Sequence, residues 1–302
     1  MSFSADVKDE LISVEIEKNC CLHAFCYGLL LCSRSFSFRE ISILTEHRQI
    51  AEKYADTINK VCSVSPCIIK SDAGKYRVEI ECAEDRAKIM AKFGYDTKLR
   101  TMRINYANIA DDCCKSAFLR GVFLSCGTVN DPNKRYHLEF VLPYKNLIKD
   151  LAYFISGFEE FEKEIEPKII QRNSNYVMYF KGSEVIEDIL TAMGAVNSSL
   201  NVMGVKMYKD MRNNVNRKLN FESANLDKTV GAASKQIEAI RKIKNTAGLS
   251  FLPEELREIA ILRYDNPDMS LRELSENLTV TLSRSGVNHR LKKICDIADS
   301  IK

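Results

Sequence analysis

The feature that most constrains this 302-residue chain is an internal repeat. Hydrophobic periodicity and turn signals predict the order helix, two strands, helix, two strands, helix over residues 20–94, and the same order over residues 113–194. Gly28 and Gly121 correspond at an offset of 93, whereas Gly94 and Gly194 correspond at 100, so a seven-residue loop difference reconciles the two copies. A duplicated unit predicts a pseudo-twofold α+β domain over residues 1–200. We expect the two apolar, glycine-containing helices at its central seam.

These two helices carry a recognisable motif. Residues 119–127, LRGVFLSCG, resemble the LAGLIDADG motif of homing endonucleases, and residues 26–34, CYGLLLCSR, resemble a more degenerate first copy. In those nucleases the resemblance implies an acid at the eighth motif position that binds Mg²⁺. Ser33 and Cys126 stand there, so the hard oxygen ligands that Mg²⁺ needs are missing. We expect no catalytic residue; a residual magnesium-dependent endonuclease with relocated ligands at Asp111, Asp112 or Asp131 is the alternative.

The chain contains eleven cysteines but no Cys-x-x-Cys and no clustered Cys/His spacing of the zinc-site kind. We expect free thiols, because a chain of this length can form a core without disulfides. The adjacent pairs Cys20-Cys21 and Cys113-Cys114 are interpreted as small apolar packing residues. The sequence therefore predicts neither a metal site nor a cofactor.

The positive charge is concentrated in the C-terminal third. The chain has 44 basic and 41 acidic residues, a formal net charge of +3. Residues 206–302 hold 18 basic and 13 acidic residues, net +5, which leaves 3 − 5 = −2 for residues 1–205. A basic stretch can be a solvated helix face or a track for phosphates. Residues 211–220 are rich in Asn and Arg, so we predict a linker or exposed arm there, within a basic linker-and-helix segment at 201–247.

Residues 248–302 are predicted to form three short helices, with a helix-turn-helix at about 269–302. Ser270 with Glu273 has the pattern of a capping box, and Ser283 can cap the last helix. Placing Val287 and its helical neighbours inward leaves the opposite face polar, with no acid from position 283 to 295. Any small helical bundle shares the apolar spacing, but this one-signed polar face favours DNA binding.

Candidate DNA-contacting residues follow from that face. Side chains that can hydrogen-bond base edges in the major groove are Arg284, Ser285, Asn288 and His289. Candidate phosphate contacts are Arg272, Arg290, Lys292 and Lys293 in the last domain, with Arg212, Arg217 and Lys218 in the basic segment. The alternatives are an ordinary exposed histidine at His289 and a surface salt bridge at Arg284.

The order of these parts resembles the WhiA family. Six separated stretches carry the resemblance: MSFSADVKDEL at 1–11, AFLRGVFLSCGTVNDP at 117–132, YHLEF at 136–140, NRKLNFESANLDKT at 216–229, LPEELREIAILR at 252–263 and SGVNHRLKKI at 285–294. The resemblance implies a non-enzymatic regulator with a degenerate LAGLIDADG-like domain and a helix-turn-helix similar to that of sigma factors. It further implies roles in transcription regulation, cell division, chromosome segregation and, in sporulating relatives, sporulation.

The resemblance also implies partners and a location. Double-stranded DNA is the expected partner, with a WhiB-like regulator as a partner in some family members; no small-molecule substrate is expected. The longest apolar run, residues 25–32, is too short for a bilayer-spanning helix of about 20 residues. The start of the chain is acidic and lacks the features of a secretory signal. We therefore expect a cytoplasmic, nucleoid-associated protein without a membrane partner.

Overall fold

The computed structural model describes residues 2–71, 74–97, 101–158, 161 and 165–301. It divides into two compact units, residues 1–209 and 210–302. Residues 72–75, with the sequence DAGK, predict a turn between two strands, and the first two of these residues, Asp72 and Ala73, lie outside the described residues. None of the described helices combines the length and the apolar character that crossing a membrane demands.

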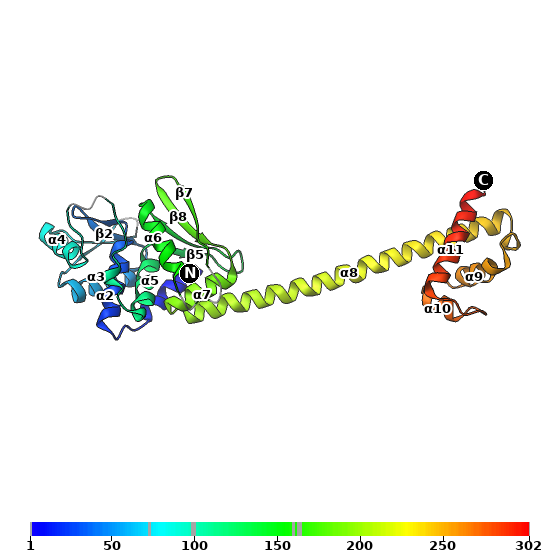
Figure 1. Ribbon diagram of the computed structural model, residues 1–302, viewed down its shortest axis with the longest axis horizontal. Helices are drawn as coiled ribbons and strands as arrows, with labels where there is room; N and C mark the ends of the chain where they lie inside the picture. Colours follow the sequence, from blue (N-terminus) through cyan, green and yellow to red (C-terminus); the bar gives the residue numbers. More distant parts are fainter. Residues whose placement is uncertain (1, 72–73, 98–100, 159–160, 162–164, 302) are drawn as a thin grey trace. The chain divides into compact units, whose positions relative to one another are not determined.

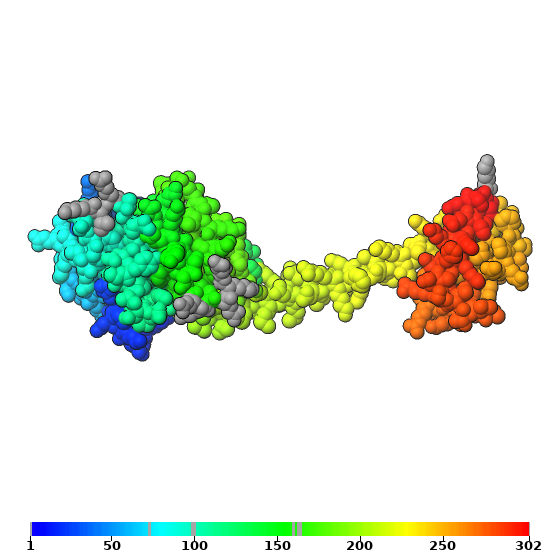
Figure 2. All heavy atoms as spheres, in the orientation of Figure 1, coloured from blue at the N-terminus to red at the C-terminus, as the bar shows by residue number. Residues whose placement is uncertain are grey.

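The first unit contains the predicted duplication. The first copy comprises α2 (Asn19–Leu31), β1 (Ser35–Phe36), β2 (Ile41–Thr45), α3 (Arg48–Cys62), β3 (Cys67–Lys70), β4 (Tyr76–Glu79) and α4 (Ala83–Lys92). The second comprises α5 (Asp112–Cys126), β5 (Gly127–Val129), β6 (Leu138–Leu142), α6 (Lys145–Ser156), β7 (Lys168–Arg172), β8 (Asn175–Phe180) and α7 (Ser183–Met193). Their antiparallel sheets have the equivalent orders β1-β2-β4-β3 and β5-β6-β8-β7. The predicted α+β fold is confirmed, and Figure 2 shows the blue-to-cyan copy packed directly on the green one.

The seam between the copies is made by α2 and α5, which lie side by side at the centre of the unit (Figure 1). Both motif glycines lie where the helix backbones touch. A Cβ atom on Gly28 would lie 2.3 Å from the carbonyl oxygen of Phe118, and one on Gly121 would lie 2.3 Å from that of Phe25. No side chain fits at such a distance, so glycine is required at both positions. This arrangement confirms the predicted seam.

The N-terminal segment folds back onto this unit through α1 (Phe3–Ser13). The helix is capped by Ser2, whose Oγ accepts a hydrogen bond from the Ala5 amide at 3.3 Å. Ser4 Oγ accepts a hydrogen bond from the amide of Val129. The Glu10 carboxylate accepts hydrogen bonds from the first-turn amides of α8 (Val196–Thr246), where the helix dipole favours an anion.

The predicted linker or arm at residues 211–220 is corrected by the structure, because α8 is one continuous helix of 51 residues from Val196 to Thr246. The side chains of residues 211–220 are exposed, as expected of an arm, but their backbone is helical. Low propensity costs only a few tenths of a kcal/mol per residue, and extending an existing helix is far easier than starting one. The Glu10 carboxylate caps the start of α8, and Ile240 and Ile243 near its end are fully buried.

The second unit contains the end of α8, a 3₁₀ turn η2 (Leu249–Phe251), α9 (Glu254–Asp265), α10 (Leu271–Glu276) and α11 (Arg284–Ser300). The capping box of Ser270 and Glu273 is present, and Ser283 caps α11. Gly248, with a φ of +77°, ends α8 in a conformation that suits glycine. Residues 277–283 connect α10, which ends at Glu276, to α11, which begins at Arg284. The predicted three-helix arrangement is confirmed.

Candidate nucleic-acid interface

Helix α11 has one buried and one exposed face. Val287, Leu291 and Ile294 are fully buried against α9 and α10. On the opposite side Ser285, His289 and Lys292 are exposed, as the helical spacing predicts. The Gly286 amide donates to Ser283 Oγ at 3.1 Å, so the start of α11 is capped while its dipole still presents positive potential there. The exposed face can therefore meet a polyanion with its N-terminal end.

The remaining predicted contacts on α11 divide between two flanks. Arg284 and Asn288 lie on the flank that faces α8 and line a cavity there. Arg290 lies on the other flank, half-buried, where its guanidinium donates to the Glu255 carbonyl oxygen at 3.1 Å. Arg290 is thus bonded to α9, which reduces its freedom to reach a phosphate. Lys293 is exposed on that same flank.

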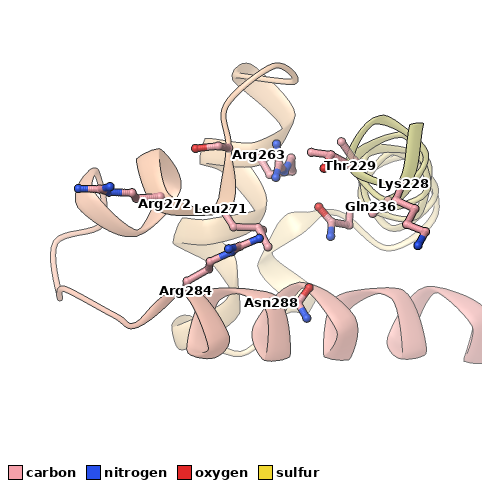
Figure 3. A pocket seen from close by; sticks show the side chains of 11 residues that line it. Lys228, Thr229, Gln236, Arg263, Leu271, Arg272, Arg284 and Asn288 are labelled. Atoms are coloured by element: carbon pink, nitrogen blue, oxygen red, sulfur yellow. The ribbon is translucent and has the colours of Figure 1, made fainter. Parts of the chain in front are cut away.

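The cavity beside α11 is strongly basic. It has a volume of about 530 Å³ and lies between the end of α8, α9, α10 and α11 (Figure 3). Its lining residues include four cations and no acid: Lys228, Thr229, Ala232, Ala233, Gln236, Arg263, Ser270, Leu271, Arg272, Arg284 and Asn288. Figure 3 shows Arg284 and Asn288 facing Lys228 and Gln236 on α8. A wall of donors without carboxylates can accommodate an anion such as a phosphate group.

Arg263 is the unusual member of that wall. Its side chain is only 2% exposed, and Nη1 donates to the carbonyl oxygens of Pro267 at 3.2 Å and Met269 at 2.6 Å. Its Nε atom is buried without a hydrogen-bond partner among the described residues. Burial lowers the pKa of this guanidinium, because its charged form loses hydration. Arg263 therefore holds positive charge at the base of the cavity.

Arg263 is absent from the contacts predicted from the sequence, although the sequence holds a signal for it. The apolar stripe of α9 is formed by Leu256, Ile259 and Ala260. Arg263 continues that stripe, because it follows Ala260 by three residues and Ile259 by four. A charged residue at an inward helical position is costly unless it has a specific role or partners. The sequence alone does not single out Lys228 and Gln236 as neighbours of α11, since only the fold brings α8 against the cavity.

The other predicted phosphate contacts are less closely grouped. Arg272 is one of the residues that line the cavity, but its exposed guanidinium points away from the other lining side chains (Figure 3), and its Nε lies 3.0 Å from the Glu276 carboxylate. Arg212, Arg217 and Lys218 are exposed on α8. Lys218 precedes the cavity residue Lys228 by ten residues, about 15 Å along a helix. These three cations form a separate exposed group on α8.

The eighth position of each LAGLIDADG-like motif in the first unit lacks a carboxylate, because Ser33 and Cys126 stand there. Ser33 is 4% exposed and donates its hydroxyl proton to the Leu30 carbonyl oxygen at 2.7 Å, and Cys126 is half-buried. Asp111 and Asp112 lie at the opposite end of α5 from Cys126, about 21 Å away over 14 residues. Asp112 pairs with Lys115 at 2.8 Å.

Asp131, the third candidate for a relocated metal ligand, lies in a turn. Its Oδ1 accepts hydrogen bonds from both the amide and the side chain of Asn133, at 2.9 and 3.0 Å. The backbone hydrogen bond from Asn133 lowers the pKa of Asp131, which is the usual behaviour of an acid that stabilises a turn. Asp112 and Asp131 therefore have local partners, and Asp111 and Asp112 lie at the end of α5 remote from the eighth motif position.

Comparison with known proteins assigns both units to one family. Residues 215–298 match the family model of the WhiA C-terminal HTH domain, and residues 115–212 match that of the WhiA LAGLIDADG-like domain. A probable cell division protein WhiA from Alkaliphilus metalliredigens is 36% identical over 99% of this chain and 98% of its own length. A protein of the same name from Bacillus cereus strain AH187 is 38% identical over 100% and 98%. The crystal structure of full-length WhiA from Thermatoga maritima aligns over 99% of this chain and 98% of its own with a TM-score of 0.62 and 25% identity.

Proposed function

The chain belongs to the WhiA family, and on this premise we propose that it is a non-enzymatic regulator that binds double-stranded DNA through α11. Its relatives are named as probable cell division proteins, so we place its action in cell division and chromosome segregation, and in sporulation where the host sporulates. This function requires a nucleoid location inside the cytoplasm. A WhiB-like regulator is the candidate protein partner.

The observation that carries the proposal is the exposed face of α11. Ser285, His289 and Lys292 project from one side of a helix whose other side is anchored in the core. A helix of this width fits the major groove, where hydroxyl, imidazole and guanidinium groups can distinguish base edges. The N-terminal end of α11 is the part that enters the groove in helix-turn-helix proteins, and Arg284 lies there.

The reading edge is the N-terminal part of the exposed face of α11, with Arg284, Ser285 and His289, and phosphate contacts would surround it. We assign Lys292 and Lys293 to the backbone of the bound duplex, because both are exposed on or beside the outer face. Arg284 and Asn288 can serve either a base edge or a phosphate that enters the basic cavity. Arg272, Arg290 and the α8 cations Arg212, Arg217 and Lys218 are assigned weaker, sequence-independent contacts, since their positions lie outside the centre of the face.

The experiment is equilibrium binding of the full-length protein to duplex DNA over a salt series. A protein that contacts Z phosphates shows a slope of log K against log salt of about −0.9Z. We expect tight binding to a preferred site selected from random duplexes, and weaker, salt-sensitive binding to random sequence. Lys149→Ala, which removes an exposed charge from α6, is the control and should leave both affinities unchanged. Binding without any sequence preference would contradict the regulator proposal.

The endonuclease alternative is tested on the same samples. Supercoiled and linear DNA are incubated with the protein over a range of Mg²⁺ and Mn²⁺ concentrations, and nicking is followed on gels. We expect no cleavage, because Ser33 and Cys126 occupy the motif positions where an acid would bind the ion. Metal-dependent nicking that disappears in Asp111→Asn, Asp112→Asn or Asp131→Asn would replace the proposal with a residual nuclease.

A further inference from the structure

Four cysteines gather where the two seam helices begin. Cys20 and Cys21 lie in the first turn of α2, and Cys113 and Cys114 lie in the first turn of α5. Their four sulfur atoms all lie within 4.8 Å of one another, and the Sγ atoms of Cys20 and Cys113 are 3.9 Å apart. Their predicted role is that of small apolar packing residues. Cys113, however, is exposed, which does not fit that interpretation.

The cluster has the symmetry of the duplicated fold. Cys20 and Cys113 are separated by 113 − 20 = 93 residues, and Cys21 and Cys114 by 114 − 21 = 93. Gly28 and Gly121 at the helix contact have the same offset, 121 − 28 = 93. Each copy of the repeat thus contributes one adjacent pair, and the pseudo-twofold relation places the two pairs opposite each other. A twofold axis of a tetrahedron relates one pair of vertices to the other pair. Two symmetry-related pairs of cysteines are therefore compatible with one tetrahedral, four-coordinate ion.

The distances also suit a single ion. Zinc binds thiolates at about 2.3 Å in a tetrahedron, which places neighbouring sulfur atoms about 3.8 Å apart. The Cys20–Cys113 separation of 3.9 Å agrees with that value, and the limit of 4.8 Å for all pairs requires only small side-chain adjustments. A disulfide would need about 2.05 Å between two sulfur atoms and would leave the other two thiols without a role.

The surroundings favour thiolates. The N-terminal ends of α2 and α5 both meet the cluster, and the positive end of a helix dipole stabilises a thiolate. Lys18 acts in the same sense on Cys113, and so does Arg120 at longer range on Cys21. These four contributions offset part of the negative charge that four thiolates around a divalent ion would carry.

The thiols influence each other's protonation. Burial, together with the hydrogen bond to Cys113, raises the pKa of Cys21 to about 11, and burial raises that of Cys114 to about 12. The hydrogen bond from Cys21 lowers the pKa of Cys113. Binding of a divalent ion would release the thiol protons as each sulfur becomes a ligand.

We propose that Cys20, Cys21, Cys113 and Cys114 bind one zinc ion, which links the first turns of α2 and α5. Four protein ligands complete the tetrahedron, so the site is structural and has no open position for a substrate. The ion would hold the two copies of the repeat together at one end of the seam, as the glycine contact holds them in the middle. Zinc is favoured over harder ions because all four ligands are soft thiolates.

The first test measures the metal in the wild-type, full-length protein, purified under reducing conditions without chelators. Elemental analysis should find about one zinc per chain, and release by a mercurial reagent should follow modification of thiols. Replacement by Co²⁺ should give the thiolate-to-cobalt absorption of tetrahedral sulfur coordination. Folded, reduced protein that neither contains zinc nor takes it up on titration would overturn the proposal. So would iron in place of zinc, or a disulfide among these cysteines found by mass spectrometry of the freshly prepared protein.

Variants then locate the site. Cys113→Ser is the least disruptive change, since Cys113 is exposed. We expect it to weaken zinc binding by at least about tenfold and to lower the Tm in a way that added zinc no longer corrects. Cys67→Ser and Cys82→Ser are matched controls, because both residues are exposed cysteines elsewhere in the same unit. Equal zinc affinity in Cys113→Ser and wild type, or an equal loss in the controls, would overturn the assignment.

Discussion

Helices α5 and α11 carry the two most distinctive sequences of the chain and use them in opposite ways. α5 is buried on almost every side, with Phe118, Leu119, Val122 and Phe123 all fully inaccessible. α11 buries one stripe and leaves its other face exposed and basic. In α5 the residue types are therefore determined by packing, and the motif that marks a nuclease elsewhere here serves the seam. In α11 the exposed residues have no packing role, so they are the ones that can reach a ligand.

The largest effect should come from breaking α5 at its closest contact. Gly121→Val places side-chain atoms where a Cβ would already be 2.3 Å from the Phe25 carbonyl oxygen. Because both partners are helix backbone, neither can move without opening the seam. We expect destabilisation on the order of 3–5 kcal/mol, seen as early thermal unfolding of the first unit by calorimetry.

Gly204→Ala is the control for that substitution. Gly204 also lies in a helix of the first unit, but a Cβ there would meet nothing within 4 Å. Alanine is the better helix former by about 1 kcal/mol, so this variant should be as stable as wild type or slightly more so. If Gly121→Val and wild type had the same Tm, the backbones of α2 and α5 would not touch at Gly121.

The next effect concerns the reading edge of α11. Arg284→Ala should weaken binding to the preferred DNA site by about 1–3 kcal/mol and affect random DNA far less, because base contacts provide discrimination. Arg284→Lys separates charge from geometry, since lysine keeps the charge but lacks the planar fork. We expect Arg284→Lys to retain affinity for random DNA while losing much of the site preference. Competition binding measures both, and equal losses on the two DNAs would place the reading edge elsewhere.

The contrast also explains what the sequence could and could not predict. The repeat, the seam and the inward stripe of α11 follow from periodicity, because Gly28, Gly121 and Val287 are positioned by local spacing. The prediction of a linker or exposed arm at residues 211–220 is wrong for the backbone, which is helical. The low helix propensity of this segment is overridden because helix continues on either side of it. The cysteine cluster had a signal in the 93-residue offset that its two pairs share with Gly28 and Gly121. The cavity at Arg263 joins residues of four helices that no spacing rule in a single sequence relates.

A smaller effect should separate phosphate contacts from base contacts. Lys292→Ala and Lys293→Ala each remove one exposed cation from α11 without disturbing its buried stripe. Each should weaken preferred and random DNA alike and reduce the magnitude of the salt slope by about one unit per lost contact. The measurement is the salt series on each variant, with Lys149→Ala as the charge-matched control. A loss confined to the preferred site would instead make these lysines specificity residues.

The smallest effect should come from the connection that positions α11. Glu258 on α9 accepts hydrogen bonds at 2.7 Å from both the amide and the hydroxyl of Thr279, and these bonds lower its pKa. A folded-state pKa below the unfolded value means that this stabilisation is fully present above about pH 4.3 and is lost as pH falls through the folded value. Glu258→Gln should therefore lower the Tm slightly near pH 7 and approach wild type in acid. Glu238→Gln, an exposed glutamate on α8, is the control. A difference between Glu258→Gln and wild type that persists unchanged at low pH would show that the carboxylate charge does not hold the connection, and that packing of the turn does.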